Sequence, residues 1–177
     1  PAVLLPLARA GQADEDAVCD ALYVAAGFGQ VIAARATLAG AEGGCQAEVG
    51  IASAMAASAA VELMGGNPQQ CLDAASTVLM NMLGLVCDPV GGLVEYPCQN
   101  RNAAGVANAL VAAELSLSGI RQLIPFDQML DAKVKKHTRK QAIVFSALNQ
   151  RRIRRTAVHH MSGALCPSGQ CDCKEYQ

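Results

Sequence analysis

The cysteines are the residues of this sequence with the clearest capacity for chemistry. The 177-residue chain has eight of them, separated by uneven gaps. The chain is longer than the small secreted scaffolds in which dense cysteines form a disulfide framework, so a metal or cluster role is the better interpretation. The eight positions are Cys19, Cys45, Cys71, Cys87, Cys98, Cys166, Cys171 and Cys173.

Three of these cysteines stand where glycine or proline interrupts an apolar run. Cys45 follows two glycines, whereas Cys87 and Cys98 flank the stretch DPVGGLVEYP. Glycines let backbone amides approach an anionic cluster and donate hydrogen bonds to its sulfides. The gaps do not show the C-x-x-C spacing of zinc sites or dicluster ferredoxins, so spacing alone leaves the ligand open.

The other cysteines favour simpler interpretations. Cys19 and Cys71 lie among Ala and Leu in predicted helices, where a thiol behaves as a small buried hydrophobe. Cys166, Cys171 and Cys173 lie near the C-terminus among Gly, Pro and Ser, and we expect exposed, reducible thiols there. The alternative is a mobile tail thiol that reaches an open metal site.

Polar residues near Cys98 and Cys45 are further candidates. Arg101 and Asn102 follow Cys98 and could bind a carboxylate or orient a ligand; the alternative is helix capping and a surface charge. We interpret Glu48 and Asp88 as acids at helix starts rather than groups that support a ligand.

The elements that must position these residues are predicted to be helices. Apolar residues make up 52% of the chain and aromatic residues 3%, so the core is built from small and aliphatic side chains. Gly27 and Gly29 suggest a close approach of another backbone or a break, and Asn67 and Pro68 form a helix start. The fold class is an all-α helical bundle with cysteine-bearing loops and an irregular basic C-terminal tail. Apolar spacing predicts helices over 14–34, 46–64, 68–83, 102–117 and 126–132.

The composition changes after residue 132. Nine of the fourteen Lys and Arg residues lie between 133 and 155, where there is no Asp or Glu. We therefore divide the chain into a helical region, 1–132, and a basic, cysteine-containing tail, 133–177. We expect His137, His159 and His160 of this tail to be exposed, and we assign none of them as a catalytic base.

Three segments resemble a known family. Residues 39–50 (AGAEGGCQAEVG), 84–102 (GLVCDPVGGLVEYPCQNRN) and 118–132 (SGIRQLIPFDQMLDA) are similar to the α-chain signature of the bacterial iron–sulfur L-serine dehydratases. The resemblance implies a [4Fe–4S] cluster held by Cys45, Cys87 and Cys98, with one iron open to substrate. It implies conversion of L-serine to pyruvate and ammonia, in which that iron acts as a Lewis acid in place of pyridoxal phosphate.

The resemblance also implies partners. The family's α chain carries further N-terminal sequence and acts with a β domain or β subunit, so we expect both, together with L-serine as ligand and an oligomeric assembly. The printed sequence does not start with a charged region followed by an apolar one, so we do not expect a signal peptide. Its charge-free apolar runs fall short of the roughly 20 residues that span a bilayer, so we expect a cytoplasmic protein without membrane contact.

The alternative function is a non-catalytic helical module whose basic tail binds a polyanion. Several Lys and Arg residues without acidic neighbours could contact phosphates. Between residues 133 and 160 the tail has a single aromatic residue, Phe145, so few side chains there could stack on bases, and nucleic acid is the less favoured partner.

Overall fold

A computed structural model of the chain describes residues 1–87 and 95–137, and only the backbone for 95 and 132–137. Within these ranges every regular element is a helix, which confirms the predicted all-α class. The helices are α1 (Leu4–Gly11), α2 (Glu15–Arg35), α3 (Gly40–Gly43), α4 (Cys45–Leu63), α5 (Pro68–Asn81), α6 (Glu95–Leu117) and α7 (Phe126–His137).

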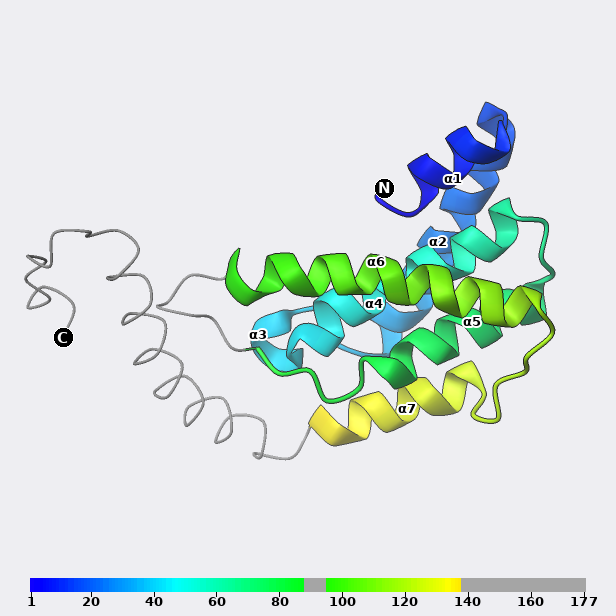
Figure 1. The fold of residues 1–177 in the computed structure, drawn as a ribbon. Helices are drawn as coiled ribbons and strands as arrows, with labels where there is room; N and C mark the ends of the chain where they lie inside the picture. The colour runs from blue at the N-terminus through cyan, green and yellow to red at the C-terminus, as the bar shows by residue number, and fades with distance from the viewer. Residues whose placement is uncertain (88–94, 138–177) are drawn as a thin grey trace, which may run out of the picture.

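Helix α4 lies at the centre of the bundle. It packs against α2, α5 and α6, and it also contacts α1 and α3 (Figure 1). Most of its residues are buried, and they are mainly Ala, Ser and small aliphatic residues. Because a helix surrounded on several sides has no broad solvent-exposed face, α4 lacks the polar stripe of a surface helix. Cys45 is the first residue of this central helix.

Glycines allow the neighbours of α4 to come close. A Cβ on Gly105 of α6 would lie 2.4 Å from the Ser53 hydroxyl oxygen, and one on Gly29 of α2 would lie 2.8 Å from the Met55 methyl carbon. The atoms that approach Gly29 belong to the Met55 side chain and not to another backbone as predicted, and a Cβ on Gly27 would meet nothing within 4 Å. Helix α2 continues through both glycines without a break.

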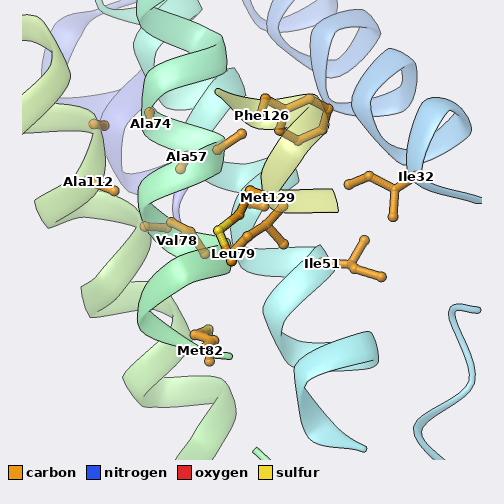
Figure 2. Packing of buried hydrophobic residues seen from close by; sticks show 14 of the residues in the cluster. Ile32, Ile51, Ala57, Ala74, Val78, Leu79, Met82, Ala112, Phe126 and Met129 are labelled. Carbon is orange, nitrogen blue, oxygen red and sulfur yellow. The ribbon is translucent and has the colours of Figure 1, made fainter. Parts of the chain in front are cut away.

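The core is aliphatic, as the composition predicts. Figure 2 shows side chains from α2, α4, α5, α6 and α7 meeting in one cluster. Phe28 and Phe126 add an edge-to-face ring contact with centroids 5.1 Å apart, which joins α2 to the start of α7. Arg35 and Asp131 form an ion pair between the same two helices. The labelled core residues of Figure 2 are Ile32, Ile51, Ala57, Ala74, Val78, Leu79, Met82, Ala112, Phe126 and Met129.

The segment between α6 and α7 is tied to α5 by polar contacts. The buried Asp73 carboxylate accepts from Arg121 Nε at 2.8 Å, and the Ser76 hydroxyl donates to the Ile124 carbonyl oxygen at 2.7 Å. Gln122 donates to the Thr77 hydroxyl at 2.7 Å. These bonds satisfy polar groups of α5 that face the bundle, and they fix where α7 begins.

Several boundaries differ from the sequence-based prediction. Helix α1 was not predicted, α7 runs on to His137 rather than ending at 132, and α6 begins at Glu95 rather than near Asn102. Tyr96 has extended angles (φ −117°, ψ 125°) and interrupts the start of α6. The remaining tail, 138–177, lies outside the described residues, so its predicted irregular structure and the division at 132 stay predictions.

Helix α2 is, among the described helices, the one long and apolar enough by length and composition to cross a membrane. Length and composition alone are weak evidence for a span. The expectation that the protein does not contact a membrane stays a prediction.

Candidate functional site

The site is built around the junction between the start of α4 and the chain after α5. Gly44, which precedes Cys45, has φ +73° and ψ 176°, a conformation essentially restricted to glycine. Its missing side chain lets Leu85 pass, because a Cβ there would lie 2.4 Å from the Leu85 carbonyl oxygen. The backbone N–H of Gln46 donates to that same carbonyl oxygen at 3.1 Å.

A second bond strengthens this junction. The side-chain oxygen of Gln46 accepts from the backbone N–H of Gly84 at 2.8 Å. The start of α4 is therefore bonded to two backbone groups of the 84–87 segment. Since Cys45 begins α4 and Cys87 ends this described segment, the two thiols come from chain segments held side by side.

The third cysteine comes from α6. Cys98 lies two residues after the break at Tyr96, in the first turn of the continuous helix, and is half-buried against the core. Cys98 and Arg101 are three residues apart and therefore lie on the same face of α6. Arg101 Nη1 donates to Cys45 Sγ at 3.1 Å and to the Val86 carbonyl oxygen at 2.9 Å.

The three thiols are neighbours. The pKa of the Cys98 thiol is raised, first by desolvation, then by the charge of Cys45 and a hydrogen bond with it, and then by the charge of Cys87. The nearby Arg101 guanidinium acts in the opposite direction. The structure thus brings together the three cysteines that the sequence singled out, and it places one cation among them. Their role as ligands stays a prediction.

The chemistry and spacing of the three thiols bear on what kind of group they could hold. Across residues 1–87 and 95–137, no three His, Cys, Asp or Glu side chains are grouped as the ligands of one metal ion. A cubane is larger, and with metal–sulfur bonds of about 2.3 Å its ligand sulfurs lie roughly 6–7 Å apart. The donors here are three thiols from three segments, of which Cys45 is only 1% exposed while Cys87 and Cys98 are partly exposed, and soft thiolates of this kind are the usual ligands of iron–sulfur clusters.

The two helical cysteines lie outside this group. Cys71 is buried, as predicted, and desolvation followed by the charge of Glu62 raises the pKa of its thiol to about 11. The prediction that Cys19 is buried is wrong, because it is exposed. Helix α2 buries only Ala21 and Ile32, so most of its circumference, including Cys19, faces outward.

The remaining candidates are distributed unevenly. Asn102 is exposed on α6, next to Arg101. Glu48 is exposed in the first turn of α4, where an acid stabilises the helix dipole, in keeping with its interpretation as a helix-start residue. For His137 the structure describes the backbone alone. Outside the described residues lie Asp88, His159, His160, Cys166, Cys171 and Cys173.

Sequence reasoning missed the part that Gln46 plays at the site. Its side chain and backbone bond to a segment 38 residues further along the chain. Nothing in the local sequence distinguishes this glutamine from an ordinary polar residue of a first helical turn. Its position directly after Cys45 was the one available signal.

Comparisons with known proteins agree with the resemblance. A family model described as serine dehydratase alpha chain matches residues 1–142. The chain is 52% identical over 132 residues to the L-serine dehydratase alpha chain of Peptoniphilus asaccharolyticus, which covers 75% of this chain and 45% of that protein. It is 56% identical over 114 residues to the probable L-serine dehydratase alpha chain of Bacillus subtilis, which covers 64% of this chain and 38% of that protein.

A third relative is a longer protein. The L-serine dehydratase of Streptomyces coelicolor is 46% identical over 107 residues, which cover 60% of this chain and 24% of that protein. The chain thus spans less than half the length of each of these three relatives. The family match covers most of the chain and includes all three convergent cysteines, so the chain belongs to the serine dehydratase alpha chain family.

Proposed function

We propose that this chain supplies the cluster-binding part of an L-serine dehydratase, with Cys45, Cys87 and Cys98 as ligands of a [4Fe–4S] cluster. The observation that carries the proposal is the convergence of these three thiols, from three separate segments, beside the Arg101 guanidinium. The relatives named L-serine dehydratase support the substrate. Their name alpha chain supports a β partner.

The reaction sets the demands on such a site. Dehydration of L-serine removes the Cα proton and the β-hydroxyl group, and the resulting aminoacrylate tautomerises and hydrolyses to pyruvate and ammonia. Hydroxide is a poor leaving group, and a bound cluster with an open iron would supply the Lewis acidity that eases its departure. The base that takes the Cα proton is not assigned to any residue of this chain.

The chain's own residues have narrower tasks. The three thiolates hold the cluster, and the buried side of α4 keeps water from Cys45. Arg101 and Asn102 remain the candidates for the substrate carboxylate. We also expect further N-terminal α sequence, an oligomer and a cytoplasmic location, as the family resemblance implies.

Anaerobic reconstitution with iron and sulfide tests the proposal. The wild-type chain should take up iron and sulfide and develop the absorption of a cubane cluster. Replacing Cys45, Cys87 or Cys98 with Ser should abolish or greatly reduce iron content, because each change removes one thiolate. Cys71→Ser and Cys19→Ser are matched controls that should retain the cluster.

Addition of L-serine supplies the second half of the test. If the open iron binds substrate, the electron paramagnetic resonance spectrum of the reduced cluster should change with L-serine and not with L-alanine, which lacks the hydroxyl. Full iron content in Cys87→Ala would contradict the ligand assignment. A wild-type chain that takes up no iron would contradict the proposed function.

A further inference from the structure

We propose that Arg101 is a positioning residue of the cluster site, which fixes the Cys45 sulfur and remains beside the bound cluster as a permanent cation. This inference rests on the proposed function. Its geometric basis is one nitrogen, Arg101 Nη1, which donates to Cys45 Sγ at 3.1 Å and to the Val86 carbonyl oxygen at 2.9 Å.

These two bonds join three segments of the site. Arg101 belongs to α6, Cys45 begins α4, and Val86 precedes Cys87. The two N–H directions of a guanidinium nitrogen are fixed by its planarity, so the sulfur and the carbonyl oxygen are held at a set angle to each other. Arg101 also lies three residues after Cys98, so its backbone is carried by the same helix as the third thiol.

The site also needs a cation. Three thiolates leave the oxidised cluster site anionic, and one-electron reduction adds another negative charge. Cys45 is 1% exposed, so water screens charge poorly at its sulfur, and a fixed guanidinium there has a larger effect than at the surface. Hydrogen bonds and net charge at ligand sulfurs set cluster potentials, and a donor cation favours the reduced state.

This role differs from binding the substrate. A residue that only binds a carboxylate would change the affinity for L-serine and leave the cluster itself unaltered. A residue that acts through Cys45 must alter cluster properties when no substrate is present. The two roles are therefore separable by measurements on the substrate-free protein.

The experiment compares R101Q, R101K and the control R121Q in the full chain after anaerobic reconstitution. Arg121 pairs with Asp73 near the N-terminal end of α5, whereas the cysteine site lies beyond the C-terminal end of that helix. We expect R101Q to keep the helical circular dichroism of the wild type but lose its cluster faster in air. Its reduction equilibrium should shift about tenfold toward the oxidised state, which corresponds to about 59 mV for a one-electron couple.

The charge-conserving variant separates charge from geometry. R101K should recover most of the potential but not the resistance to air, because an ammonium keeps the charge without the planar pair of N–H bonds. R121Q should match the wild type in both measurements. A potential and an air-loss rate in R101Q equal to those of R121Q would overturn the inference while leaving the proposed function intact.

Two further outcomes are also decisive. If the wild type takes up no iron, the proposed function and this inference fail together. If the wild type assembles a cluster but neither Arg101 variant does, the positioning role is tested by backbone amide hydrogen exchange in the cluster-free chain. Faster exchange across residues 84–87 in R101Q than in R121Q supports the positioning role, and equal exchange overturns it.

Discussion

Gly44 should be the glycine whose replacement disturbs the cysteine site most. Its φ of +73° with ψ near 180° is a region that alanine enters at a cost of about 1–3 kcal/mol. A Cβ at Gly44 would also lie 2.4 Å from the Leu85 carbonyl oxygen and 3.1 Å from the Val86 Cα. Both atoms are backbone, so no side-chain rotation can relieve the overlap.

The overlap must therefore move the 84–86 segment away from α4. That movement stretches the bonds that Gln46 makes with Leu85 and Gly84, and each neutral hydrogen bond contributes about 1 kcal/mol. Together with the backbone conformation, we expect Gly44→Ala to lower the free energy of unfolding by roughly 3–5 kcal/mol. A domain of ordinary stability has about 5–15 kcal/mol in total, so this loss is large.

Urea denaturation followed by far-ultraviolet circular dichroism measures this change, with the slope m checked for constancy. Gly27→Ala is the matched control, because a Cβ there meets nothing within 4 Å inside a helix, and it should stabilise the chain by about 0.5–1 kcal/mol. Reconstituted iron should fall in Gly44→Ala and stay unchanged in Gly27→Ala. An unfolding free energy of Gly44→Ala within about 0.5 kcal/mol of wild type, with unchanged m, would refute this account of the junction.

Three further predictions concern other parts of the chain. Gly105→Ala should lower the free energy of unfolding by about 1–3 kcal/mol, because its Cβ would overlap the Ser53 hydroxyl between α6 and α4; urea denaturation checks this, and an unchanged midpoint would contradict it. Because burial and Glu62 raise the pKa of Cys71 to about 11 from an ordinary value of 9.0, its contribution to stability is complete below pH 9 and is lost as the pH rises through 11. Denaturation at pH 8 and pH 10.5 should show a steeper loss in the wild type than in Cys71→Ala, and equal losses would be evidence against the shift. Deleting residues 138–177 should leave iron content unchanged, whereas any salt-sensitive retention on heparin should disappear with them; loss of iron would assign a part to the tail cysteines.

The best-predicted elements are those with strong local signals at their ends. The helix predicted over 46–64 is Cys45–Leu63, because glycines bound it on both sides. The helix predicted to start at Asn67 and Pro68 does so, and the Asn67 side chain accepts from the Gln70 backbone N–H at 3.0 Å. These helix-end signals act within one helical turn, so they can be recognised from the sequence alone.

The start of α6 shows where local signals fail. Asn100 and Asn102 are good capping residues, and Pro97 is a good helix opener, so the sequence offers several helix starts within two turns. The structure begins α6 at Glu95, with a break at Tyr96, and buries part of the first turn against the core through Cys98. The local preferences of these residues leave the alternative helix starts nearly equal in free energy, and the packing of α6 against the core determines which one forms.

Part of the candidate site could likewise be predicted from the local sequence, and part could not. Glycine and proline near Cys45, Cys87 and Cys98 marked these cysteines as different from Cys19 and Cys71, and the family resemblance gave them a common role. The bond from Arg101 to Cys45 spans 56 residues, so no sequence pattern within α6 could indicate it. Only the packing of α6 across α4 brings the guanidinium to the sulfur.

The separation of the three cysteines along the chain has a consequence for biosynthesis. Cys45 opens the central helix, but its partners lie 42 and 53 residues later, beyond the whole of α5. A ribosome must therefore release α4, α5 and the start of α6 before the three sulfurs can meet. Under the proposed function, cluster insertion would then be a late event that reports on completed folding, and packing defects in α4 or α5 should appear in a cell as iron-poor protein before they appear as missing protein.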